Sequence, residues 1–317
     1  MSRFRRAAVP ALLLCALMSG RASAQCWGAV PCPEPEARLS FAGEVQTAAI
    51  NSALGGVTAG LLRRARGGSF REGFLAGAAG GALVYAGKRV AAEPWGGAGL
   101  LGREVAAVGS SVVWNASAGR APLERVVLPV GPVRLYVERG PGPRVRPKLD
   151  FASAAALALV AAAPGTELDW GESLSAGAPI FRRTLPYHGD QWQGEHVAGV
   201  ISYRAEDGRV LAAPGRRAQV LAHERVHVIQ HDQAFLFWSE PAERALLGRS
   251  RLGRALGRHV DLGLNVPALG AFQQFLPYRA RPWEREASLL GGTGEVGGHG
   301  TGGDEDGDGG RLRPSRP

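Results

Sequence analysis

Two histidines and a glutamate with the spacing of a metal-binding helix lie in the segment LAHERVHVIQHD, residues 221–232. His223 and His227 are four positions apart, and Glu224 follows the first of them, which gives the pattern H-E-x-x-H. Residues four apart on a helix share one face, so two imidazoles can bind one metal ion while the glutamate reaches a water molecule beside it. We therefore expect His223 and His227 to be metal ligands and Glu224 to be a general base.

The other histidines near this motif are weaker candidates. His231 lies one turn after His227, but positions 223 to 231 of a helix span more than about 10 Å, too far for one ion. We expect His231 and Asp232 to support the ligands from behind or to lie on the surface. His188 and His196 precede the motif, and either could line the cleft, although we favour solvated loop positions for both.

The motif needs a rigid helix, and the sequence from Arg216 to Trp238 favours one. This stretch follows a Pro-Gly pair, contains neither glycine nor proline, and spaces its apolar residues with a helical period. We expect the helix to end near Ser239, before Pro241. Two further helices are expected, over residues 241–259 and around 278–290.

The extended motif HERVHVIQ has the form H-E-x-x-H-V-x-Q and resembles that of bacterial zincin-like metallopeptidases of the gluzincin type. In gluzincins the third ligand is a glutamate on a later helix. The CAAX-prenyl-protease and anti-repressor-peptidase families supply it from E-x-x-A-[D/N] or E-x-E-A-[D/N]. The segment PWEREASLL carries Glu284, Glu286 and Ala287 in this register, with Ser288 where those families have Asp or Asn.

This resemblance implies that His223, His227 and Glu284 bind Zn²⁺ and that Glu286 points elsewhere. Glu286 and Glu240 remain the alternative third ligands, since Glu240 is only 13 residues beyond His227. A catalytic zinc site has three protein ligands and one open position, so a single additional carboxylate would complete it.

Such a site would hydrolyse bonds in a peptide or protein substrate. Zinc lowers the pKa of its bound water towards about 7, and Glu224 takes the proton and passes it to the leaving amine. Tyr278, Tyr187 and Tyr203 are candidate donors to the oxyanion, and a sheet edge beside the helix would bind substrate as an added strand. The alternative is a non-enzymatic cell-envelope protein with a structural or degenerate metal site. Oligomeric state stays open.

The first 24 residues have the pattern of a secretory signal peptide. Arginines precede an apolar run, and Ala22-Ser23-Ala24 fits a cleavage site, which predicts export to the periplasm or cell envelope. Cys26 and Cys32 then lie close together near the mature N-terminus, where an exported protein is expected to form one small disulfide loop. Without residues 1–24 the formal charge falls from +9 to +5, and no dense basic patch with interleaved aromatics indicates nucleic-acid binding.

Residues 44–118 are rich in glycine and alanine. Gly73, Gly77 and Gly81 recur every four positions, which predicts a helix face that another backbone can approach closely. The uninterrupted apolar run is short for a membrane span, so a soluble helix pair is favoured. Membrane association through residues 70–90 remains an alternative.

From residue 121 to 213 the apolar runs are short and separated by turn-like sequence, which predicts a small antiparallel sheet. The whole chain is therefore expected to have an α+β fold. It would consist of an N-terminal segment (25–43), glycine/alanine-rich helices (44–118) and a zincin-like α+β domain (119–290) that carries the H-E-x-x-H helix. The glycine-rich, charged tail (291–317) is expected to be disordered.

Overall fold

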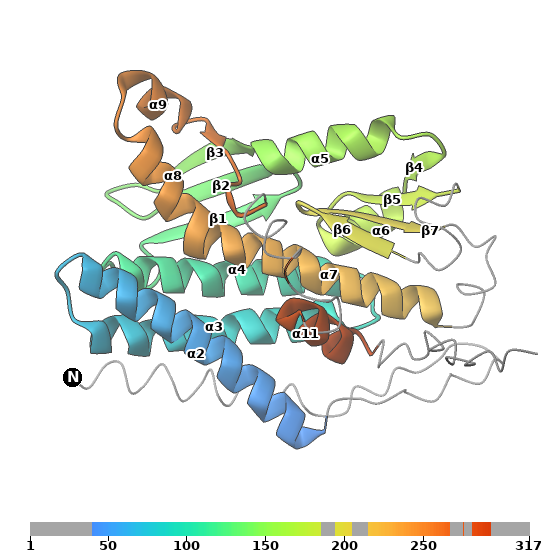
Figure 1. The fold of residues 1–317 in the computed structure, drawn as a ribbon, viewed down its shortest axis with the longest axis horizontal. Coiled ribbons are helices and arrows are strands. Elements are labelled where there is room, and N and C mark those ends of the chain that lie inside the picture. Colours follow the sequence, from blue (N-terminus) through green and yellow to red (C-terminus); the bar gives the residue numbers. More distant parts are fainter. Residues whose placement is uncertain (1–39, 185–193, 205–214, 267–274, 276–280, 293–317) are drawn as a thin grey trace, which may run out of the picture.

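The computed structural model describes residues 40–184, 194–204, 215–266, 275 and 281–292. Within these residues the protein has the expected α+β fold, with helices at the N-terminal side, two small sheets, and a long central helix (Figure 1). The predicted signal peptide, Cys26 and Cys32, and the tail beyond residue 292 lie outside the described residues.

Three glycine/alanine-rich helices form one layer of the molecule: α2 (Phe41–Ala65), α3 (Phe70–Ala91) and α4 (Ala98–Ser117). The predicted glycine stripe of α3 packs against α2, as expected. A Cβ atom at Gly73 would lie 2.8 Å from the Ala59 carbonyl oxygen, and one at Gly77 would overlap the Gly55 carbonyl. Because glycine lacks this atom, the two backbones can touch.

The opposite face of α3 packs against α4 in the same way. A Cβ atom at Gly80 would lie 2.6 Å from the Gly109 carbonyl oxygen, and Gly87 packs against Gly102. Residues 70–90 are thus packed between two helices. No helix in the described part of the chain is long and apolar enough to cross a membrane.

The region predicted as one antiparallel sheet contains, in its described part, seven strands and two helices, and with β8 from outside this region the strands form two four-stranded sheets. The first sheet has the order β1-β2-β3-β8, and the second has the order β4-β5-β7-β6. Each sheet contains one parallel pair, β3 with β8 and β5 with β7. The elements are β1 (Arg125–Val130), β2 (Val133–Glu138), β3 (Arg144–Asp150), α5 (Phe151–Ala162), β4 (Thr166–Leu168), α6 (Trp170–Ala176), β5 (Ile180–Arg183), β6 (Gly194–Val197), β7 (Val200–Arg204) and β8 (Val260–Asp261).

The motif helix α7 (Arg216–Ala234) does not end before Pro241 as predicted. It continues through a π-helical segment, η1 (Phe235–Ser239), into α8 (Glu240–Leu247). Pro241 lies in the first turn of α8, where its missing N–H does not interrupt an α-helical hydrogen bond. The helix predicted over 241–259 is divided, because the chain turns after Gly248 before α9 (Arg251–Leu256) begins.

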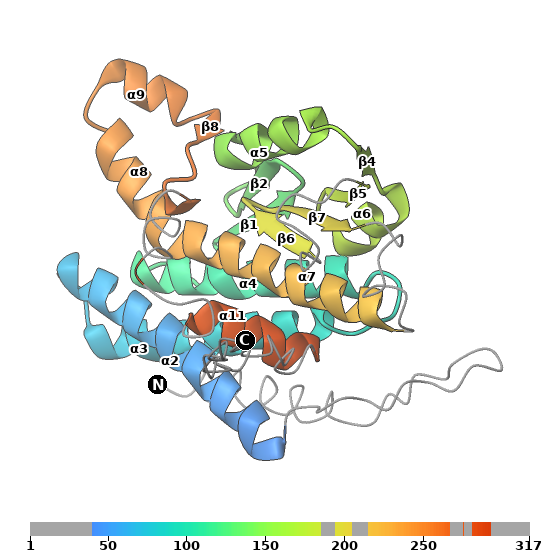
Figure 2. The ribbon, with the colours of Figure 1, turned by 45° about the vertical axis from the view of Figure 1, so that its right-hand side comes forward.

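Helix α7 occupies the centre of the fold and is buried on several sides. Its Ile229 packs with Val84 and Ala106 of the glycine-rich layer, while its Val228 packs with Ile201 of the second sheet. The last described helix, α11 (Pro282–Gly291), lies against α7, while β6 runs along another side of it (Figure 2). The helix that carries the motif is therefore held by elements from both ends of the sequence.

Candidate metal centre

His223, His227 and Glu284 meet where α7 and α11 pack together. The Nε2 atoms of the two histidines are 3.0 Å apart. The Glu284 Oε2 atom lies 3.1 Å from His227 Nε2 and 3.5 Å from His223 Nε2. The three side chains are only 9%, 9% and 12% exposed. The structure thus brings the three predicted ligand residues into one buried group.

The close approach of α11 to α7 depends on a glycine at its C-terminal end. A Cβ atom at Gly291 would lie 2.8 Å from the His223 backbone nitrogen. Pro282, in the first turn of α11, starts this helix, and Glu284 follows in the same turn. The helix can therefore present Glu284 to the two histidines at short range.

The donor set and its spacing fit a tetrahedral metal ion. Two imidazole nitrogens and one carboxylate oxygen are the ligand types found in catalytic zinc sites. Ligands at about 2.0–2.1 Å from a tetrahedral ion are separated from one another by about 3.3 Å. The separations of 3.0, 3.1 and 3.5 Å agree with this value.

Gln230 determines which nitrogen of His227 carries a proton. Its Nε2 donates to the Trp283 carbonyl, at 3.0 Å, and to Glu286 Oε2, at 2.8 Å. The amide oxygen of Gln230 is therefore the atom that faces His227 Nδ1, at 2.7 Å, and this oxygen can only accept. In a neutral His227 the proton lies on Nδ1, and Nε2 directs a lone pair towards the Glu284 carboxylate.

Two acceptors that face each other at 3.1 Å need a cation between them. Burial lowers the pKa of His227, but the Glu284 and Glu224 carboxylates and the contact with Gln230 outweigh it and raise the pKa overall. Positive charge, supplied by a proton or a metal ion, is therefore stabilised at this nitrogen.

Glu286 lies outside the group formed by His223, His227 and Glu284, and it is the centre of a buried polar network. Its carboxylate accepts from Lys88 Nζ, at 2.8 Å, and from Asn51 Nδ2, at 2.7 Å, in addition to Gln230. Burial raises the pKa of Glu286, but Lys88 and the hydrogen bonds lower it overall. The network links His227 to α2 and α3.

Glu224 lies beside the ligands, and one of its oxygens has no partner. The residue is 5% exposed, and its Oε2 atom forms no hydrogen bond with any residue in the described ranges. Burial raises the pKa of Glu224, although His223 and His227 act in the opposite direction. A Cβ atom at Gly194 of β6 would lie 2.8 Å from Val220 Cγ1 and 3.0 Å from Glu224 Oε1, so the strand backbone passes close to this carboxylate.

His196 lies in a strand beside His227, and His231 is buried next to Asp232. His196 is part of β6, with its ring 6.1 Å from that of His227, so it is not a solvated loop residue. Its Nε2 accepts from Gly199 N–H at 2.8 Å, and burial holds its pKa well below the usual range.

His231 is outside the ligand group, as expected, but both it and Asp232 are buried. Asp232 pairs with Arg103 at 2.7 Å, which is why it can lie in the interior.

The remaining candidates lie elsewhere or outside the described residues. Glu240 accepts from Trp114 Nε1 at 2.6 Å in a separate cluster and is not part of the group formed by His223, His227 and Glu284. The Tyr203 hydroxyl donates to Asp169 at 2.7 Å, so this tyrosine is already occupied in another network. Tyr278, Tyr187 and His188 lie outside the described residues.

The prediction from sequence did not identify the supporting roles of Gln230, Lys88 and Asn51. The spacing of Gln230, three residues after His227, was the available signal for the first, because residues three apart share a helix face. Lys88 is one of only two lysines and stands in a glycine- and alanine-rich helix, which indicates a buried charge with a partner. Asn51 gave no comparable signal.

The chain matches no known protein-family model, no curated protein and no solved structure. The interpretation of this site therefore depends on the motif and on the arrangement of its side chains. That arrangement is a buried group of two histidines and a glutamate that could hold a metal ion, with a second glutamate alongside.

Proposed function

We propose that the protein is a zinc-dependent hydrolase of the metallopeptidase type, which cleaves peptide bonds. One observation carries this proposal: the Nε2 atoms of His223 and His227 and the Oε2 atom of Glu284 converge, and Glu224 lies beside them with an oxygen that has no partner within the described ranges. Zn²⁺ in such a site supplies Lewis-acid chemistry, which polarises a carbonyl and lowers the pKa of water.

The other steps of the reaction are assigned to side chains of the protein. His223, His227 and Glu284 hold the ion, and Gln230 fixes the tautomer of His227 so that Nε2 faces it. Glu224 accepts a proton from water at its free oxygen and delivers it to the leaving amine. Three protein ligands leave one position open, which favours a catalytic site over a closed structural one, since structural zinc sites have four protein ligands.

The substrate would bind along β6. This strand pairs with β7 and is the outermost of the described strands in its sheet. It passes Glu224 at Gly194 and carries His196 beside His227. An extended peptide that added to β6 by main-chain hydrogen bonds would run past both the ligands and the base. Together with export through residues 1–24, this describes a periplasmic or cell-envelope peptidase.

Metal analysis and proteolysis of a Glu224→Gln variant test the proposal. Wild-type protein should contain about one zinc per chain and degrade unfolded casein. Glu224→Gln should retain the zinc, because Glu224 is not a ligand, and should lose most of the activity. The loss should be at least about 100-fold, the lower end of a typical general-base contribution.

Glu167→Gln is the matched control for this experiment. Glu167 is a surface carboxylate that pairs with Arg182, and its loss should leave both zinc content and activity unchanged. Full activity in Glu224→Gln would refute the assigned base. Bound zinc without activity in the wild type would instead favour the non-enzymatic envelope protein with a structural metal site.

A further inference from the structure

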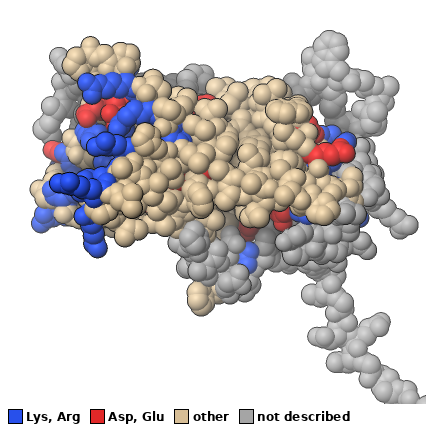
Figure 3. Space-filling view, turned by 90° about the horizontal axis from the view of Figure 1, so that it is seen from above, with Lys and Arg blue, Asp and Glu red and all other residues tan. Residues whose placement is uncertain are grey.

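A second charged site lies at the end of the molecule that holds α8 and α9. A cavity of about 280 Å³ opens there between these helices and the first sheet. Lysine and arginine side chains gather on the surface at this end (Figure 3). Six cationic residues line the cavity: Arg125, Arg146, Lys148, Arg244, Arg254 and Arg258.

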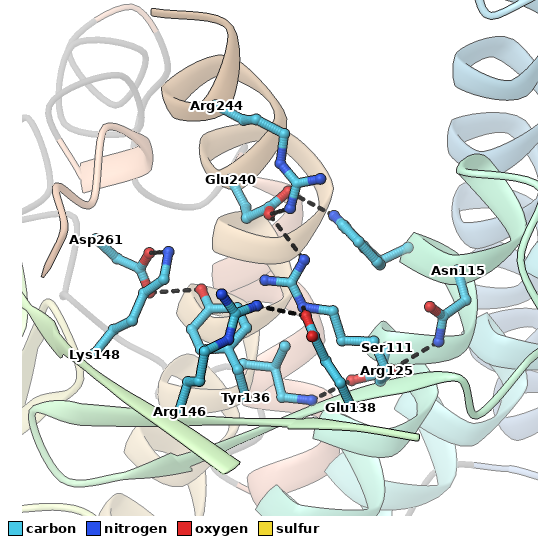
Figure 4. A network of polar contacts seen from close by, with 12 residues as sticks. Ser111, Asn115, Arg125, Tyr136, Glu138, Arg146, Lys148, Glu240, Arg244 and Asp261 are labelled. Atoms are coloured by element: carbon cyan, nitrogen blue, oxygen red, sulfur yellow. Dashed lines mark hydrogen bonds and ion pairs between the residues drawn. The ribbon is translucent and has the colours of Figure 1, made fainter. Parts of the chain in front are cut away.

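The three carboxylates in the cavity wall already have donors. Asp261 accepts from the Tyr136 hydroxyl at 2.6 Å and from Lys148 at 2.9 Å (Figure 4). Glu240 accepts from Trp114 and from Arg244. Glu243 accepts from the Ser239 hydroxyl and from the backbone N–H groups of residues 262–264. These acids therefore belong to the wall.

Arg125 is buried in the wall without a matching set of acceptors. It is 4% exposed, and its guanidinium lies 4.4 Å from the ring centres of both Trp114 and Tyr136. The nearest carboxylate oxygens are distant, at 3.5 Å for Glu240 and 3.7 Å for Glu138, and its Nε has no hydrogen-bond partner among the described residues. A buried guanidinium with unfilled donors is costly, and an anion in the cavity would compensate it.

Two cations at the rim also lack carboxylate partners. Arg254, on α9, and Arg258, four residues later, are both exposed and line the cavity. Neither forms an ion pair with a residue in the described part of the chain; Arg254 donates only to the Gly248 carbonyl, at 2.9 Å. The rim can therefore offer two guanidinium groups to a ligand.

The sign and size of the charge indicate a dianion. Six cations against three carboxylates leave an excess of three positive charges in the lining, or two if Glu138 behind Arg146 is included. A phosphate monoester carries a charge of about −1.5 to −2 at neutral pH, and guanidinium groups match its oxygens in pairs. The volume of about 280 Å³ is just below the range for drug-sized ligand sites, about 300–1,000 Å³, which suits a small ligand.

We propose that this cavity, the basic pocket, binds the phosphate group of a small phosphorylated compound. The pocket is independent of the metal centre. Glu240 in its wall is 13 residues beyond His227 along the same helical rod, or about 20 Å at the rise of a helix.

Calorimetric titration of the full chain with inorganic phosphate and with glycerol phosphate tests the proposal. Both probes should bind saturably at one site in a chloride buffer of constant ionic strength. A preference for glycerol phosphate would identify the ligand as a monoester, and a preference for inorganic phosphate would identify the free ion. The Arg254→Gln/Arg258→Gln double variant should bind about tenfold more weakly, since each exposed charge contributes up to about fivefold.

Arg251→Gln is the matched control, because Arg251 is an exposed arginine on α9 that does not line the cavity. It should change binding by less than about twofold. If Arg251→Gln weakened phosphate binding as much as the double variant, the effect would reflect general surface charge, and the proposal would be overturned. Absence of saturable phosphate binding would overturn it as well, and binding of heparin alone would assign the surface to an extended polyanion instead.

Discussion

The candidate metal centre and the basic pocket lie on the same helical rod, formed by α7, η1 and α8, but their charged side chains are of opposite sign: carboxylates at the first and an excess of guanidinium groups at the second. At the candidate metal centre, His227 Nε2 faces the Glu284 carboxylate, and Glu224 Oε2 has no hydrogen-bond partner in the described part of the chain. In the basic pocket, Arg125 Nε has no hydrogen-bond partner among the residues that the structure describes. Buried polar groups normally have hydrogen-bond or ionic partners. We therefore expect a cation to bind at the candidate metal centre and an anion to bind in the basic pocket.

The supports of the two sites also differ. The metal centre is held through Gln230 and Glu286 by Lys88 and Asn51 of the glycine-rich helices. The basic pocket is held by the first sheet, through the Tyr136–Asp261 and Lys148–Asp261 contacts. A change in one support should therefore affect one site and spare the other, because separate polar networks behave additively.

Replacement of Glu284 should produce the largest difference between the effects on zinc binding and on phosphate binding. Glu284→Ala removes one of three ligands, and we expect zinc affinity to fall by more than about 100-fold, which is the upper limit for loss of a supporting residue. Phosphate binding should remain unchanged. Competition with a fluorescent chelator measures the first quantity and calorimetry the second, with Glu167→Ala as the surface control. Unchanged zinc affinity would remove Glu284 from the ligand set.

Replacement of Gly81 tests the support of the metal centre. A Cβ atom there would lie 2.8 Å from the carbonyl carbon of Asn51, so Gly81→Ala must push α2 away from α3. We expect a loss of about 1–3 kcal/mol in the free energy of unfolding, the usual cost of overpacking, measured by urea denaturation. Zinc affinity should fall with it, because Asn51 holds Glu286, whereas phosphate affinity should not change.

Gly96→Ala provides the control for this substitution. No atom lies within 4 Å of a Cβ placed at Gly96, so the free energy of unfolding should change by less than about 0.5 kcal/mol. Equal effects of the two substitutions would mean that close backbone contact at Gly81 does not support the metal centre.

Replacement of Gln230, which contacts His227 directly, tests the same site, and we expect a smaller loss of zinc affinity than for Glu284→Ala. Gln230→Leu removes the acceptor of the His227 Nδ1 proton, and loss of such a partner typically weakens metal binding by about 10–100-fold. Gln233→Leu is the control, because Gln233 is a buried amide on the same helix without a hydrogen bond to His227. If both variants weaken zinc binding equally, the effect reflects packing of α7 and not the orientation of the histidine.

The parts of the metal centre that could be predicted are those with a local signal. The four-residue spacing of His223 and His227 defines one helix face, and the ExEA segment placed Glu284 by resemblance. The glycine stripe of α3 was predictable for the same reason, since its period equals that of the helix. The α+β class followed from the change of period between the N-terminal and middle regions.

The parts that could not be predicted depend on contacts between distant segments. Asn51 meets Glu286 across 235 residues, and Arg125 meets Glu240 across more than a hundred, so no spacing rule applies to either pair. The two-sheet arrangement was missed because α5 and α6 are short and alanine-rich or irregular, and their sequences were interpreted as parts of strands. The continuation of α7 beyond Ser239 was missed because a proline was assumed to end the helix, although the first turn of a helix accepts one.

The smallest expected effect on either site is that of replacing Glu104 on α4, a residue that belongs to neither site. Burial raises its pKa from 4.5 to about 7, against the attraction of Arg103 and with some contribution from Asp232, which belongs to α7. The folded protein therefore keeps a proton on Glu104 between about pH 4.5 and 7, whereas the unfolded chain has released it. Stability must fall as pH rises through this window, since the folded state binds more protons there.

A pKa difference of this size corresponds to roughly 3 kcal/mol, and because Glu104 is partly exposed we expect about 1–2 kcal/mol. Glu104→Gln, which cannot titrate, should flatten this part of the dependence of unfolding free energy on pH and should be more stable than the wild type at pH 8. Urea denaturation at pH 5 and pH 8 measures both quantities. Because Glu104 belongs to neither site, zinc and phosphate affinities at one pH should be the same in the two proteins. A change in only one of these affinities would show that α4 is energetically coupled to that site. The two sites would then not be independent of the region around Glu104.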